Sequence, residues 1–88
     1  MALRLSKSVE VAEVQGGIAL FDALRQDTHF IPPPCDSLIP LLKQGKCTKL
    51  SLYDQLRKLS PEYTDAELST HLKEFIASAE SRNLIEAD

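Results

Sequence analysis

The order of hydrophobic and polar positions divides the chain into an alternating first third and a helically spaced remainder. In residues 8–14 two valines alternate with charged or small residues, which predicts a strand with one face toward water. The alternation ends at residues 15–17, where paired glycines favour a tight hairpin turn. Residues 18–22 are therefore predicted to form the returning strand.

A third strand is predicted at Asp27–Ile31, antiparallel to the second because the connection is short. Three prolines at 32–34 end it, since proline cannot donate a ladder hydrogen bond and holds φ at about −65°. Proline also suits the first turn of a helix, so the residues that stop the strand can begin a helix. The pattern predicts a three-stranded meander placed directly before a helical region.

The first helix is predicted over residues 34–44 and is closed by Gly45. Its apolar face consists of Leu38, Ile39, Leu41 and Leu42. Pro40 in the interior would remove a backbone hydrogen bond and kink the helix. Either the helix bends there, or it begins later, near Ser37, with Pro40 in its first turn.

Two further helices each begin at a hydroxyl residue followed three positions later by an acid. Ser51 is the predicted N-cap of a short helix ending near residue 59, and Thr64 that of a longer helix running to about Arg82. Asn83 is the predicted left-handed residue after the last turn. The stripe that the long helix should bury is Leu68, Leu72, Phe75, Ile76 and Ala79.

The predicted order is β-β-β-α-α-α, an α+β fold that resembles a winged helix-turn-helix with its sheet moved to the front. The chain has 88 residues, of which 43% are hydrophobic and 26% charged, without a linker or repeat. That composition is typical of a globular protein. We therefore expect residues 1–88 to form a single domain.

Charge and cysteine usage narrow the function classes. The net charge is −3, with ten Lys and Arg scattered among thirteen acids, which argues against binding driven by nucleic-acid phosphates. The two cysteines are twelve residues apart with no histidine at ligand spacing, so we expect no metal site and no cofactor. No apolar run suits a signal peptide or a membrane span, and we expect a cytoplasmic protein with reduced thiols.

Catalytic chemistry has little support in the sequence, and we expect no enzyme activity. His29 shares a strand face with Asp27, which is better interpreted as a surface pair than as an oriented base. His71 lies on another element with no nucleophile beside it. Cys35, at a predicted helix start, is expected to be a half-buried structural thiol, and Cys47 an exposed thiol in a loop.

The long helix is a poor candidate for reading DNA. Its expected exposed residues are Asp65, Glu67, Glu74, Glu80 and Ser81, against Lys73 and Arg82. Acids would repel phosphates. The third strand offers another surface, because it is an outer strand of the predicted meander and carries a single charge. An extended peptide could add there through backbone hydrogen bonds.

Three runs resemble the PqqD-like proteins, small peptide chaperones also called RiPP recognition elements. They are SVEVAEVQGGIALFDALRQDTHFIPPPCDSLIPLLKQG, SLYDQLRKL and ELSTHLKEFIASAESRNLIE, and the first begins at residue 8 and the last ends at residue 86. The resemblance lies in the order of the pieces rather than in a single motif. It implies a domain that binds the leader segment of a ribosomally made precursor peptide and presents it to a modifying enzyme. The DTH run before the prolines is most similar to a subgroup associated with HPr-kinase-related proteins, which makes a kinase-like enzyme a candidate partner.

The resemblance also implies where the leader binds. It adds as a strand beside the third strand and lies in the groove toward the long helix. The implied contacts are Asp27, Thr28, His29, Phe30 and Ile31, with groove-lining residues on the helix. We favour the margin with His71, Phe75, Ser78 and Arg82, because a cation there could meet an acidic leader. The opposite margin of the apolar stripe carries Ser69, Ile76 and Glu80, and the sequence leaves open which margin faces the groove.

Two alternatives stay open on the sequence. One is a DNA-binding winged-helix regulator, which would need a basic recognition surface. The other is a small adaptor subunit whose sheet edge pairs with a partner protein or with a second copy in a homodimer.

Overall fold

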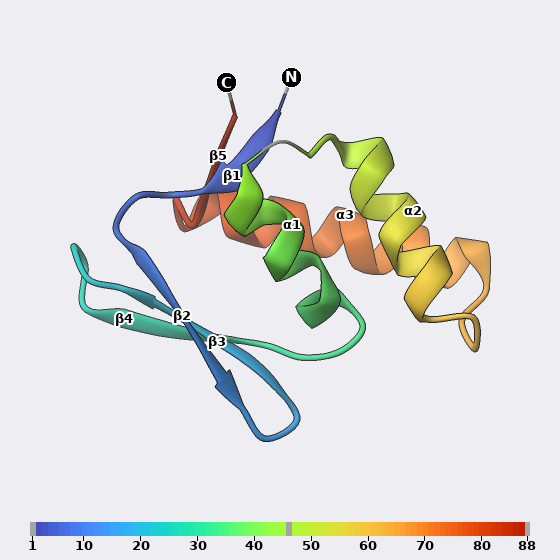
Figure 1. The fold of residues 1–88 in the computed structure, drawn as a ribbon, viewed down its shortest axis with the longest axis horizontal. Helices are drawn as coiled ribbons and strands as arrows, with labels where there is room; N and C mark the ends of the chain where they lie inside the picture. The colour runs from blue at the N-terminus through green and yellow to red at the C-terminus, as the bar shows by residue number, and fades with distance from the viewer. Residues whose placement is uncertain (1, 46, 88) are drawn as a thin grey trace.

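The computed structural model describes residues 2–45 and 47–87 and has a sheet beside a layer of helices (Figure 1). The strands are β1 (Leu3–Leu5), β2 (Val9–Val14), β3 (Gly17–Asp22), β4 (Asp27–Ile31) and β5 (Ile85–Ala87). A 3₁₀ turn, η1 (Cys35–Leu38), precedes helices α1 (Ile39–Gln44), α2 (Lys49–Leu59) and α3 (Asp65–Ser81). The predicted α+β class, with three antiparallel strands followed by three helices, is confirmed.

The main sheet has the order β2-β3-β4 and is antiparallel throughout. Val14 pairs with Gly17 across a two-residue turn in which Gly16 has φ 84°, a left-handed conformation that favours glycine. On β3, Ile18 and Leu20 point inward and are buried. The central strand therefore anchors the sheet to the helices and leaves β2 and β4 as its edges.

The helices bury the residues that their spacing predicts. All five stripe residues of α3 are buried: Leu68, Leu72, Phe75, Ile76 and Ala79. They pack in one core with Leu52 and Leu56 of α2 and with Leu38 of η1. Asn83 has the predicted left-handed conformation, with φ 57°, and the Leu84 N–H then bonds the Ala79 carbonyl to close the helix.

A second, two-stranded sheet was not predicted. β1 pairs antiparallel with β5, and Leu3 lies opposite Ala87. Leu3 and Ile85 are buried, so this ladder closes the core at the end of α3. Three-residue strands carry too few positions to show alternation, which is why the sequence pattern missed them.

The starts of the first two helices differ from the simplest expectations. The predicted start at residue 34 is wrong for the α-helix, because residues 35–38 form η1 and α1 begins at Ile39 with Pro40 in its first turn. This agrees with the later of the two expected starts. The Ser51 N-cap is also wrong: Thr48 caps α2, and Ser51 is the third helical residue of that capping box.

The expectation that Cys47 is an exposed loop thiol is wrong. Cys47 is 4% exposed, and its Sγ donates to the Leu3 carbonyl at 3.3 Å. A backbone bond from the Leu3 N–H to the Cys47 carbonyl joins the same two residues. The thiol is buried because the unforeseen strand β1 covers it.

α3 begins with a capping box that we expect to make the stability of the protein depend on pH. The Glu67 carboxylate accepts the Thr64 N–H at 2.8 Å, while the Thr64 hydroxyl accepts the Glu67 N–H at 3.1 Å. The Thr64 hydrogen bonds lower the pKa of Glu67 below its ordinary 4.5. A lowered folded-state pKa contributes stability above the ordinary value, and that contribution is lost as the pH falls through the folded-state pKa.

We therefore expect the melting temperature of Glu67→Gln, which keeps a capping side chain, to fall less than that of the parent protein as the pH is lowered. Glu62→Gln, outside the helix, is the matched control. Thermal melts from pH 7 to pH 3 measure both variants. An acid limb as steep in Glu67→Gln as in the parent would contradict the prediction.

Candidate functional site

The outer edge of β4 is open. Val14 and Gly17 flank the hairpin turn as a hydrogen-bonded pair, and at the other end of the two strands the Ala23 N–H donates to the Ser8 carbonyl. Because hydrogen-bonded pairs alternate along an antiparallel ladder, the odd-numbered residues of β3 bond to β2. By alternation, Ile18, Leu20 and Asp22 of β3 bond to β4. On β4, the backbone groups of Thr28 and Phe30 therefore face away from the sheet. Pro32 is next in that series and has no N–H, so the open edge ends there.

α3 lies opposite this edge, and a pocket of about 230 Å³ separates the two. Its walls are Phe30, Ile31, Pro32, Pro33, Pro34 and Cys35 on one side and His71, Glu74, Phe75 and Ser78 of α3 on the other. Ile31 and Phe75 are buried and make an apolar floor, while His71 is half-buried and Ser78 exposed. We call this pocket, with the adjoining edge of β4, the β4–α3 groove.

Two arginines lie at one end of the β4–α3 groove. Nη1 of Arg82 lies 3.0 Å from Nδ1 of His29, which links the C-terminal end of α3 to the middle of β4. Nη1 of Arg25 donates to the Arg82 carbonyl at 3.3 Å. The arginine donor requires Nδ1 of His29 to act as the acceptor, so the ring proton lies on the other nitrogen in this contact. Asp27 is exposed and lies beyond His29 on the same strand face.

Two acids, Asp36 and Glu74, lie near Cys35 at the other end of the groove. Burial, followed by the charges of Asp36 and Glu74, raises the pKa of Cys35 from 9.0 to about 11. The Sγ of Cys35 donates to the His71 carbonyl at 3.6 Å and is 7% exposed. A thiol with this pKa stays protonated at neutral pH and is a poor nucleophile. Cys35 therefore joins η1 to α3 as a structural residue.

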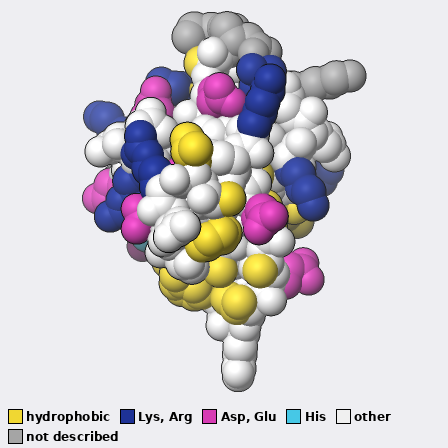
Figure 2. Space-filling model, turned by 90° about the vertical axis from the view of Figure 1, so that its left-hand side faces the viewer, with side chains coloured by type: hydrophobic (Ala, Val, Ile, Leu, Met, Phe, Trp, Pro, Cys, Tyr) yellow, Lys and Arg dark blue, Asp and Glu magenta, His cyan; other side chains and the backbone are white. Residues whose placement is uncertain are grey.

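The side chain of Phe30 lies on the outer face of the sheet rather than in the groove. A Cβ on Gly17 would lie 2.8 Å from the Phe30 ring and 2.5 Å from the Ile31 carbonyl oxygen, so the ring covers this glycine. Val14 and Phe21 share the outer face and are also exposed. Figure 2 shows hydrophobic side chains gathered in the lower half of its view, where the sheet lies. Phe30 contributes its backbone to the groove and its ring to this outer face.

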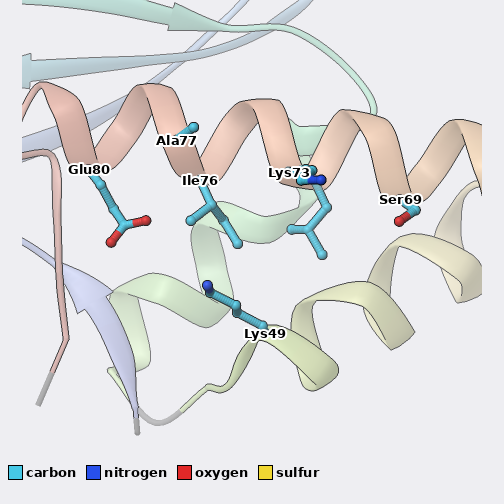
Figure 3. Close-up of a pocket in the computed structure, with 7 residues that line it drawn as sticks. Lys49, Ser69, Lys73, Ile76, Ala77 and Glu80 are labelled. Atoms are coloured by element: carbon cyan, nitrogen blue, oxygen red, sulfur yellow. The ribbon is translucent and has the colours of Figure 1, made fainter.

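The opposite margin of α3 lines a different pocket, of about 400 Å³, against the start of α2 (Figure 3). Ser69, Ile76 and Glu80 lie there with Lys49 and Lys73, over a floor that includes Leu72. The two margins of α3 therefore face different surfaces. His71, Ser78 and Arg82 lie on the β4 side, and Ser69, Ile76 and Glu80 lie on the α2 side.

The structure brings most of the expected contact residues together. Phe30, Ile31, His71, Phe75 and Ser78 line one pocket, and His29 meets Arg82 beside it. Thr28 contributes to the open edge. Asp27 lies at its far end and lines none of the pocket.

Sequence reasoning missed Pro32, Pro33, Pro34, Cys35 and Glu74 as parts of the groove wall. Glu74 lies three residues after His71 and four before Ser78, and this helical spacing was a usable signal. The positions of Pro34 and Cys35 depend on the path of the chain after the prolines, which the local pattern does not specify.

Within residues 2–45 and 47–87, no group of His, Cys, Asp and Glu is placed to hold a metal ion. None of the described helices is long and apolar enough to cross a membrane.

Comparisons with known proteins give one clear likeness. No family model matches the chain, and no curated protein matches its sequence. A solved structure, TbiB1 in complex with the TbiA(beta) leader peptide, superposes with a TM-score of 0.74 and 19% sequence identity. The alignment covers 97% of this chain and 99% of that one. The two chains share their fold along almost their full lengths.

Proposed function

We propose that this protein is a peptide chaperone without catalytic activity, a RiPP recognition element of the PqqD-like kind. It binds the leader segment of a ribosomally synthesised precursor peptide as an added strand on β4 and presents it to a modifying enzyme. The observation that carries the proposal is the open edge of β4 beside an apolar-floored groove on α3. Strand addition uses the free backbone groups for affinity and the neighbouring side chains for selectivity.

The structural likeness supports the same function. TbiB1 has this fold and was solved with a leader peptide bound. A shared fold is compatible with many functions, so the proposal rests on the groove and the likeness adds support. The sequence resemblance to PqqD-like proteins, which depends on the order of the same elements, points to the same class of ligand.

The modifying enzyme and the cellular compartment follow from the resemblance and the composition. A kinase-like enzyme is the candidate partner, and a cytoplasmic location fits a chain with two buried free cysteines. The pocket against α2 lies on the opposite margin of α3, so an enzyme docked there would leave the β4–α3 groove open.

The alternatives have less support. A DNA-binding regulator needs a basic helix, whereas α3 has two acids in its first turn and no basic residue in its last. An adaptor or homodimer that pairs through the sheet would use the same β4 edge or the exposed outer face. Mass measurement at two protein concentrations identifies self-association.

An NMR titration tests the proposed function. Isotope-labelled protein is titrated with short peptides from a precursor gene beside its own gene and, separately, with a random DNA duplex. We expect peptide-induced shifts in β4 and on the His71 and Ser78 margin of α3, and no shifts with DNA. Shifts along α3 that appear only with DNA and fade with added salt would replace the proposal with the regulator alternative.

A further inference from the structure

The β4–α3 groove carries opposite charges at its two ends. Glu74 lies in α3 and Arg82 is its C-cap residue, eight residues later, which corresponds to about 12 Å along the axis. Neither side chain has an oppositely charged partner within 4.0 Å among residues 2–45 and 47–87. Each is exposed and available to a ligand.

A second charge of the same sign reinforces each end. Asp36 and Glu74 both act on Cys35, so two carboxylates lie near the end of the groove where β4 leaves the sheet. Arg25 reaches the Arg82 carbonyl, so two guanidinium groups lie at the end where β4 begins. Asp27 is an acid on the same side as these two arginines. It lies beyond His29 and does not line the pocket.

The spacing of these charges matches an added strand. Alternate side chains of a strand point the same way, about 6.8 Å apart, so residues i and i+4 are about 14 Å apart on one face. That distance is close to the separation of Glu74 and Arg82 along α3. The side chain at i+2 then lies over the floor made by Ile31 and Phe75.

The direction of β4 sets the order of the charges. Arg82 lies beside the middle of β4, through His29, and Glu74 lies beside the end of β4, through Ile31 and the prolines. A peptide that adds antiparallel to β4 therefore starts at Glu74 and finishes at Arg82. Antiparallel pairing is the slightly more stable geometry per residue and the more common one.

We infer that the groove selects peptides with the pattern base-x-apolar-x-acid, read from the N-terminus, with the base beside Glu74 and the acid beside Arg82. This inference rests on the proposed function, because it specifies which peptides the β4–α3 groove accepts. The apolar residue fills the pocket and supplies most of the affinity. The charged residues set the position and direction of the strand, since exposed ion pairs add little affinity but mismatched charges are rejected.

Selection from a displayed library of random twelve-residue peptides tests the inference. The library is selected separately on the parent protein, on Glu74→Lys and on Glu80→Lys. Glu80→Lys makes the same charge change on the α2 margin of the same helix and is the matched control. We expect base-x-apolar-x-acid peptides from the parent and from Glu80→Lys, and an acid in place of the base from Glu74→Lys.

A charge swap with one selected peptide then measures the pair directly. Changing the base of that peptide to glutamate should weaken binding to the parent about three- to tenfold and should be compensated in Glu74→Lys. The inference would be overturned if selection on the parent protein enriched peptides regardless of where their charges lie. It would also be overturned if the selected peptides had the order acid-x-apolar-x-base.

The same selection separates failure of the inference from failure of the proposed function. Peptides that lose binding when Thr28 is replaced by proline, yet show no charge order, would leave strand addition standing and refute the charge pattern. Peptides that bind the Thr28→Pro variant as tightly as the parent, or a library that yields no binders, would refute both.

Discussion

Replacing Thr28 with proline should reduce binding of a leader peptide by at least about tenfold while the protein stays folded. The Thr28 N–H faces the open edge of β4, and proline removes that donor and puts its ring in the path of the incoming strand. The Thr28 side chain is exposed on the outer face, so the core loses no contact. Fluorescence anisotropy with a labelled peptide from the precursor gene measures the effect. Phe30→Pro should act in the same way, with the added loss of the ring over Gly17.

The matched control is Glu13→Pro on the other edge of the sheet. The N–H of Glu13 faces away from β3 by the same alternation, and its side chain is exposed. This variant should bind the peptide like the parent. If Thr28→Pro kept its circular dichroism spectrum and parental affinity, peptide addition at β4 would be excluded.

Leu20→Ala should cost about 2–5 kcal/mol of unfolding free energy. Leu20 is fully buried at the centre of β3, between the pairs that join it to Val11 and His29. Removing its branched end leaves a cavity, because β3 is held by ladders on both sides and cannot move toward the helices to fill it. A domain of this length has a total stability of roughly 4–13 kcal/mol, so the loss is a large part of the whole.

Leu24→Ala is the control for this prediction, because it is the same substitution at a side chain that is 82% exposed. It should change the unfolding free energy by less than about 0.5 kcal/mol. Urea denaturation followed by circular dichroism measures both variants. Similar losses in the two would mean that Leu20 does not lie in the core.

The elements that the sequence predicted are those whose pattern is local and long. The alternation in β2 and the 17-residue helix α3 each contain several periods of one repeat, and the glycine turn is marked by its residue type. The buried stripe of α3 was therefore predictable residue by residue. His29 and Arg82 are 53 residues apart, and their direct contact was not predicted: the resemblance placed the strand and the long helix on one groove, and no local pattern pairs the two side chains.

The features that were missed depend on contacts between distant parts of the chain. β1 forms because it pairs with β5, and both strands are too short to show an alternating sequence pattern. The burial of Cys47 follows from that pairing. The start of α2 was misplaced because Thr48 and Ser51 both have suitable side chains, and only the geometry of the capping box distinguishes them. Pro34 and Cys35 became groove residues once the path of the proline segment was known, whereas the helical spacing of Glu74 to His71 and Ser78 could have identified it.

The β1–β5 ladder gives the chain the topology of a nearly closed ring. With Leu3 opposite Ala87, the backbone enters and leaves the fold at one place, which Figure 1 shows above the helices and away from the β2–β3 hairpin. A fused domain at either end would thus project from the same side. The arrangement also suits circular permutation, in which a short linker joins the ladder strands and new ends open in the exposed turn at Gln15 and Gly16. Such a permutant would keep β4 continuous and could carry a tethered peptide to its edge.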